Sequence, residues 1–160
     1  MMSARTRITT GTGGGVNVEL PVDIRDLLAS LARQLVELME DPEAAKDPGL
    51  QRLFPPASMD DPMESLGFEQ LMGDALRAGK REAAAILRAT ANATHLNQEE
   101  TLAWMRCIND IRLVIGTRLD IQEDTDIEAM FADDLMEQAA VTYVALTELV
   151  EMLARAADPT

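Results

Sequence analysis

The residues that could do chemistry gather in one predicted helix, ETLAWMRCINDIRLVIGTRLD, at residues 100–120. It contains the only cysteine of the chain, Cys107, and an arginine, Arg112, beside an apolar stripe. A thiolate supports redox chemistry, and a guanidinium binds carboxylates and phosphates. At about 100° per residue, the stripe consists of Trp104, Ile108, Ile111, Ile115 and Leu119.

Arg112 falls on the shoulder of this stripe, so it points towards the other helices. A buried guanidinium needs a partner, because an unpaired buried charge is costly. One interpretation is an ion pair with a buried acid that fixes the register of the helices. The other is an anion or small-ligand site formed with Asn109 near Gly116, where the missing side chain allows a close approach. Both interpretations remain open at this point.

Cys107 lies about 60° from the centre of the stripe, on the opposite shoulder. No histidine is close in sequence, and Arg118 lies too far along the helix to lower the thiol pKa strongly. A packing cysteine at the edge of the core and a redox-sensing thiol both fit this position. With one cysteine, a sensor could form only intermolecular or mixed disulfides.

The sequence contains no catalytic signature. Its only histidine, His95, lies in a predicted connector, and no Cys/His cluster has the spacing of a metal site. The glycine-rich segment TGTGGG at residues 10–15 lacks the Gly-Lys-Ser/Thr of a phosphate-binding loop. We therefore expect no enzyme activity, no catalytic residues, no metal and no cofactor.

The spacing of apolar residues predicts four long helices that must position these side chains. They cover about residues 23–41, 62–90, 98–119 and 133–156. Asp23 is the predicted N-cap of the first helix, and Asn97 and Glu100 form a capping box at the third. Asp47 and Pro48 predict a short helical turn after the first helix.

The predicted inner faces follow steps of three and four residues. In the first helix they are Ile24, Leu28, Leu31, Leu35 and Leu38. In the second they are Phe68, Met72, Ala75, Gly79, Ala83 and Ile86, with a kink or a close helix approach expected at Gly79. In the last they are Leu135, Ala139, Thr142, Leu146, Leu149 and Leu153.

These elements predict an all-α fold, a helical bundle of about four long helices. The segments RTRIT and VNVEL predict a small N-terminal β-hairpin or extended arm over residues 1–20. Residues 21–157 are expected to form a single helical-bundle domain.

The 160 residues have a net charge of −14. Residues 120–160 include a predicted acidic connector up to residue 133, and they hold eleven acidic residues against one basic residue, Arg155. This charge disfavours direct nucleic-acid binding, and it either keeps the protein soluble or steers a basic protein partner. The sequence shows no signal peptide and no run of apolar residues that could span a membrane, so we expect a cytoplasmic protein.

The segment AWMRCINDIRLVIGTRLDIQED resembles the signature helix of the AosR-like family of actinobacterial oxidative-stress transcriptional regulators, first catalogued as a domain of unknown function. The residues that carry the match are Trp104, Asn109, Asp110, Arg112, Leu113, Gly116, Thr117, Arg118 and Leu119. The segments LLASLARQLVELMEDP, DPGLQRLFPP and GKREAAAILRAT also fit the layout of that family. The resemblance covers about residues 16–155. It implies control of transcription at the protein level, with thiol chemistry in some members.

The favoured hypothesis is therefore a non-enzymatic regulatory protein that acts by protein–protein contact. The expected partner is a sigma factor or an RNA polymerase subunit, and the heptad-like stripes predict a homodimer. The candidate interaction or structural motif is Asn109, Asp110, Arg112, Gly116, Thr117 and Arg118, and the candidate redox thiol is Cys107. The alternative is a helical domain that binds a small ligand or an anion near Arg112 and Asn109.

Overall fold

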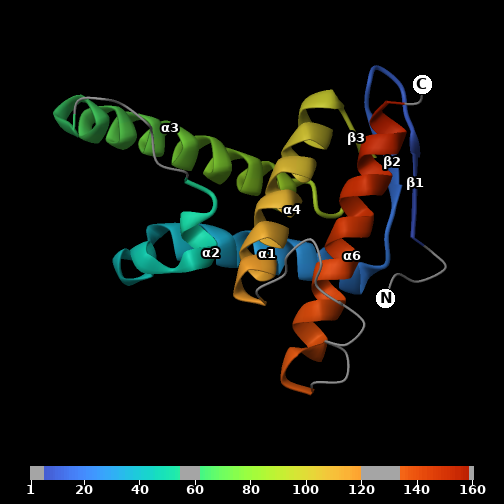
Figure 1. The fold of residues 1–160 in the computed structure, drawn as a ribbon. Coiled ribbons are helices and arrows are strands. Elements are labelled where there is room, and N and C mark those ends of the chain that lie inside the picture. The colour runs from blue at the N-terminus through green and yellow to red at the C-terminus, as the bar shows by residue number, and fades with distance from the viewer. Residues whose placement is uncertain (1–5, 55–61, 120–133, 159–160) are drawn as a thin grey trace.

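The computed structural model describes residues 6–54, 62–119 and 134–158, without the side chains of residues 45–46, 62–72 and 134–135. The described residues form four long helices, as predicted (Figure 1). These are α1 (Val22–Glu40), α3 (Pro62–Ala89), α4 (Gln98–Arg118) and α6 (Asp134–Ala157). A 3-10 turn (Pro42–Lys46) and the short helix α2 (Pro48–Gln51) connect α1 to the segment before α3. The predicted acidic connector, residues 120–133, lies outside the described residues.

Helix α4 is the central element, because it contacts α1, α2, α3 and α6. Figure 1 shows α6 on one side of α4 and α3 on the other, with α1 crossing below. Only the C-terminal half of α3 lies beside α4 and α1, and its N-terminal half extends away from the other helices (Figure 1). The neighbouring helices therefore determine which side chains of α4 are buried and which remain accessible.

The predicted N-terminal hairpin is present as β1 (Arg7–Thr10) and β2 (Val16–Glu19). A third antiparallel strand, β3 (His95–Leu96), pairs with β2 through the register Val16↔Leu96. The sequence analysis missed β3, because two residues are too few to show an alternating pattern. The hydroxyl of Thr10 donates a hydrogen bond of 2.8 Å to the carbonyl oxygen of Ala156 and joins the hairpin to the end of α6.

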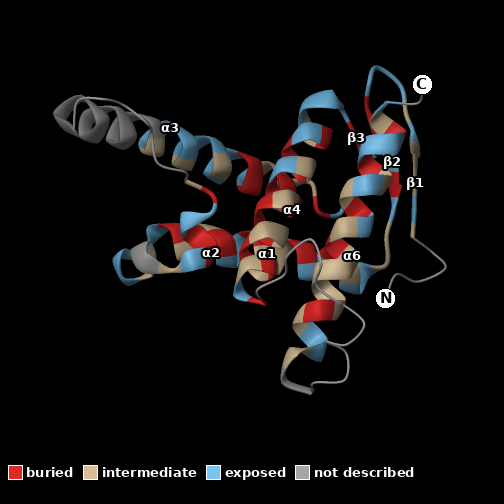
Figure 2. Cartoon of the chain, in the orientation of Figure 1, coloured by how far each residue is buried: buried red, intermediate tan, exposed pale blue. Residues whose placement is uncertain are grey.

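One core holds the sheet and the helices together. Figure 2 shows the buried residues on the sides of the helices and of β2 that face each other. The largest side chains that are almost fully buried are Trp104, Leu28, Leu87, Leu96, Ile108, Leu146, Leu149, Leu153, Val16 and Val18. Because this set contains residues of β2, β3 and every long helix, the hairpin packs into the same core as the helices.

The helix starts agree with the sequence analysis in two of three places. The capping box at α4 is complete. The backbone NH of Asn97 donates to Oε1 of Glu100, and the backbone NH of Glu100 donates to Oδ1 of Asn97, both at 2.8 Å. Asp47 caps α2 through the backbone NH groups of residues 49 and 50. Asp23 is not the N-cap of α1, because the helix begins one residue earlier and Pro21 occupies the cap position without a side-chain hydrogen bond.

The predicted inner face of α1 was partly wrong. Its buried residues are Arg25, Leu28, Ala32, Leu35 and Met39. The predicted residues Ile24, Leu31 and Leu38 are only partly buried, because the face is rotated by about one residue towards small and charged positions. A pattern of large aliphatic side chains does not include Arg25 and Ala32, although both are buried.

The predicted inner face of α3 was also partly wrong. The buried positions are Ala83, Ala84 and Leu87, whereas Ala75 and Gly79 are exposed. No described heavy atom lies within 4 Å of a Cβ built on Gly79, so no described helix approaches closely there. The side chains of the other predicted positions, residues 68 and 72, lie outside the described residues. The error arises because only the C-terminal half of α3 is covered by other helices.

Helix α6 follows its prediction more closely. Leu146, Leu149 and Leu153 are buried, and Ala139 and Thr142 are half-buried. The side chain of residue 135 is not among those described.

Within the three described ranges, no helix combines the length and the apolar character that a membrane span requires.

Candidate functional site: the polar residues of α4

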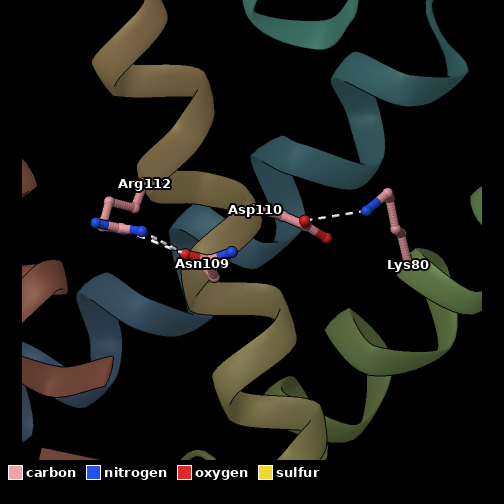
Figure 3. Close-up of polar contacts among 4 residues, drawn as sticks. All are labelled: Lys80, Asn109, Asp110 and Arg112. Carbon is pink, nitrogen blue, oxygen red and sulfur yellow. Dashed lines mark hydrogen bonds and ion pairs between the residues drawn. The ribbon is translucent and has the colours of Figure 1, made fainter. Parts of the chain in front are cut away.

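Arg112 is half-buried and is held by its own helix (Figure 3). Its Nε and Nη2 atoms donate hydrogen bonds of 3.2 and 2.7 Å to Oδ1 of Asn109. The guanidinium carbon also lies 5.9 Å from the centre of the Tyr143 ring of α6. No carboxylate of the described residues lies within ion-pair distance of Arg112. Among the described residues the partner of Arg112 is therefore the amide of Asn109, three residues earlier, and the pairing of Arg112 with an acid stays a prediction.

The close approach predicted at Gly116 is made by α6. Gly116 is buried, and a Cβ built on it would lie 2.9 Å from Cε1 of Tyr143. The space left by the missing side chain is thus filled by the tyrosine ring. Asn109 Oδ1 bonds to Arg112 and the Tyr143 ring lies against Gly116, so these groups already have partners within the fold.

Asp110 points to the opposite side of α4, where its carboxylate meets Lys80 of α3 (Figure 3). The distance from Lys80 Nζ to Asp110 Oδ1 is 3.0 Å. Burial raises the pKa of Asp110 above its ordinary value, although the hydrogen bond and the charge of Lys80 lower it. Helix α4 therefore contributes a partly buried ion pair that joins it to α3 through Asp110.

The last two residues of the candidate motif are also used within the fold. The hydroxyl of Thr117 donates a hydrogen bond of 2.8 Å to the carbonyl oxygen of Leu113. Arg118 Nη2 lies 2.9 Å from Asp47 Oδ2. Partial desolvation raises the pKa of Asp47, but hydrogen bonds from Arg118 and from two backbone NH groups hold it below its ordinary value. Arg118 therefore fixes the residue that caps α2.

Cys107 is 0% exposed, so it lies in the core and not at its edge. Burial raises the pKa of the Cys107 thiol to about 12, and the nearby charge of Asp110 contributes. A redox-sensing cysteine needs an accessible thiolate. The folded structure provides neither the access nor the thiolate, so the geometry favours a packing role.

Sequence reasoning missed Arg25, a buried arginine at the start of α1. Its guanidinium donates four hydrogen bonds of 2.7–3.2 Å to the backbone carbonyl oxygens of Val18, Leu20, Ala91 and Ala93. Burial lowers the pKa of Arg25 from its ordinary value. The spacing of residues is a signal of this burial. Residue 25 precedes residues 28, 32, 35 and 39 in steps of three and four, which places all five on one face of α1.

Two grooves flank α4. The first, called here the α1/α4 groove, has a volume of about 370 Å³. It is lined by Leu31, Gln34, Leu35, Glu37, Leu38, Asp41, Ile111, Val114, Ile115 and Arg118.

The second groove, called here the α3/α4 groove, consists of two adjoining hollows of about 340 and 210 Å³ that share Gly79, Ala83 and Arg106. Its other lining residues are Ala75, Leu76, Lys80, Glu82, Ile86, Glu99, Leu102, Ala103, Asn109 and Asp110. In the part of the chain that the structure describes, no group of three or more His, Cys, Asp or Glu side chains is placed to hold a metal ion.

Comparison with known proteins identifies one family. No curated protein and no solved structure matches the chain. One family model, described as a domain of unknown function (DUF2017), matches residues 4–157. Because this match covers almost the whole sequence, the chain belongs to the DUF2017 family.

Proposed function

We propose that this chain is a non-enzymatic, cytoplasmic regulatory protein that acts by binding another protein. The resemblance of its α4 segment to AosR-like transcriptional regulators supports a role in transcription under oxidative stress. The observation that carries the proposal is the α1/α4 groove.

The walls of this groove have the character of a helix-binding site. Three leucines of α1 and three β-branched residues of α4 line it, and several of these side chains are only partly covered. A groove with apolar walls between two helices receives the apolar face of an amphipathic helix. We therefore assign the groove to a helix of the partner protein.

The rim of the groove indicates the charge of that helix. Glu37 and Asp41 are exposed there, and Glu37 pairs with Arg33 of its own helix. The one basic residue of the lining, Arg118, is paired with Asp47. The net charge of the chain, −14, has the same sign as the rim. A partner helix with basic residues beside its apolar face complements both features. A sigma factor or an RNA polymerase subunit that presents such a helix is the partner that we propose.

The alternative function, a small-ligand or anion site near Arg112 and Asn109, receives no support from the geometry. The two side chains bond to each other, and neither groove includes Arg112 in its lining.

Affinity capture from the native cell lysate, followed by quantitative mass spectrometry, tests the proposal. We would compare the wild type with Glu37→Arg, which reverses an exposed rim charge, and with Leu38→Ala, which removes part of the apolar wall. Glu148→Arg is the matched control, since Glu148 is exposed on α6 and lines neither groove. We expect a sigma factor or a polymerase subunit with the wild type and the control, and markedly less with the groove variants.

The partner recovered in this way is then purified and titrated against the same variants. Binding that weakens with rising salt and with Glu37→Arg is the expected result. Equal recovery with all variants would show that the α1/α4 groove is not the binding site. If no transcription protein is recovered with the wild type, the regulatory function itself is wrong.

A further inference from the structure

We propose that the α3/α4 groove is the docking surface for a second copy of this chain, in a dimer with two-fold symmetry. This groove lies on a different face of α4 from the α1/α4 groove and shares no lining residue with it. The dimer therefore does not depend on the proposed function.

Two exposed leucines mark the groove as a contact surface. Leu76 of α3 is 37% exposed and Leu102 of α4 is 45% exposed. They are two of the four large hydrophobic residues that are exposed in the described part of the chain. Leu76 lines one hollow of the groove and Leu102 lines the other, so each hollow has an exposed apolar side chain that a partner can cover.

The floor of the groove consists of small residues. Gly79 and Ala83 are shared by both hollows, and Ala75 extends the floor at one end. A glycine in the interior of a helix weakens the helix relative to alanine. At Gly79 no described atom uses the space that the missing side chain leaves. A helix of a second copy could pack closely against this floor, and that contact would account for the glycine.

The charges of the groove favour a second copy over an unrelated partner. Arg106 is exposed, lines both hollows and has no ion-pair or hydrogen-bond partner among the described residues. Within the same described ranges, Glu82 and Glu99 are equally exposed and unpaired. In a two-fold interface, each patch meets its own copy. Arg106 of each chain can therefore face an acid of the other, and both unpaired charges are satisfied at once.

This arrangement also fits the electrostatics of the whole chain. Two copies with a net charge of −14 each repel one another over most surfaces. The α3/α4 groove carries two basic and three acidic side chains, so its charge is close to balanced. It is thus a face on which two copies can meet with little repulsion.

The test is the molar mass of the purified full chain, measured by light scattering over a wide range of protein concentration. We expect the wild type to reach twice the 17.5 kDa of one chain. Leu102→Glu and Arg106→Glu should each shift the mass towards that of one chain, with unchanged circular dichroism. Arg155→Glu is the matched control, because Arg155 is exposed on α6 and lines neither groove.

A charge exchange tests the pairing directly. If Arg106 faces an acid of the second copy, Arg106→Glu combined with either Glu82→Arg or Glu99→Arg should restore the dimer. A wild type that stays at 17.5 kDa at every concentration overturns the proposal. A dimer that survives both single variants places the interface elsewhere. Failure of both exchanges to restore the dimer refutes the reciprocal ion pairs.

Discussion

The same substitution, glycine to alanine, should have opposite effects at two helical positions of this protein. Alanine stabilises the interior of a helix by about 1 kcal/mol relative to glycine. At Gly79 the added methyl group meets no described atom of the same chain within 4 Å, so Gly79→Ala should raise the free energy of unfolding of the monomer by about 1 kcal/mol. At Gly116 the same methyl group would lie 2.9 Å from the Tyr143 ring.

The crowding at Gly116 sets the size of the second effect. Extra methyl groups in a packed interior cost about 1–3 kcal/mol, because neighbouring side chains must shift. After the gain in helix propensity of about 1 kcal/mol is subtracted, Gly116→Ala should be destabilising by up to about 2 kcal/mol. The ring of Tyr143 has limited freedom to move away, since it is half-buried and lies beside the Arg112 guanidinium.

A double-mutant cycle separates the two contributions. In a Tyr143→Ala background the ring is absent, so Gly116→Ala should now stabilise the fold by about 1 kcal/mol. Urea denaturation followed by circular dichroism measures each variant, at several protein concentrations so that any effect of Gly79→Ala on dimerisation is visible. If Gly116→Ala stabilises the protein as much as Gly79→Ala does, the close packing of α6 on α4 is wrong.

Three further predictions concern buried polar groups. Arg25→Met should lower the free energy of unfolding by about 2–6 kcal/mol in urea denaturation, because two carbonyl oxygens in buried bonds to Arg25 lose their donor at about 1–3 kcal/mol each. An unchanged free energy of unfolding would refute the buried hydrogen bonds of Arg25. Lys80→Met should destabilise the fold more at about pH 7 than at about pH 4. The raised pKa of Asp110 favours the neutral carboxyl group at low pH, and stability is lost as pH rises through that pKa and the carboxylate becomes charged without its partner. A loss in melting temperature that is independent of pH would contradict this. Cys107, with a thiol pKa of about 12, should react with a chromogenic disulfide reagent about a thousandfold more slowly in the native state than in urea; a fast native reaction would restore it as a redox thiol.

The features that sequence predicted well depend on residues close to each other in the chain. The capping box at Asn97 and the cap at Asp47 are local arrangements, and both formed as expected. The inner faces of α1 and α3 depend on which neighbouring helix covers them, and no local pattern contains that information. In α3 the apolar spacing predicted Ala75 and Gly79 on the inner face, but no described helix covers these two positions.

The candidate site shows the same division. The position of Arg112 beside the apolar stripe predicts that it needs a partner. Which residue is the partner depends on the side-chain distances in the folded protein. Asn109 is three residues away and bonds to it, whereas the buried acid, Asp110, faces α3. The spacing of α1 places Arg25 on the buried face, but it does not identify the partners of Arg25. These are backbone carbonyl groups of residues 18–20 and 91–93, and such groups have no signature in the sequence.

The hydrogen bond between Thr10 and Ala156 has a consequence for the order of folding. It joins residues 146 positions apart, and α6 packs on both β1 and β2. During synthesis the hairpin leaves the ribosome before α6 does. Val16 and Val18 are fully buried in the finished fold, but the surface that covers them is complete only after α6 has been synthesised. We expect chains that stop before α6 to expose this apolar strand and to be recognised by chaperones.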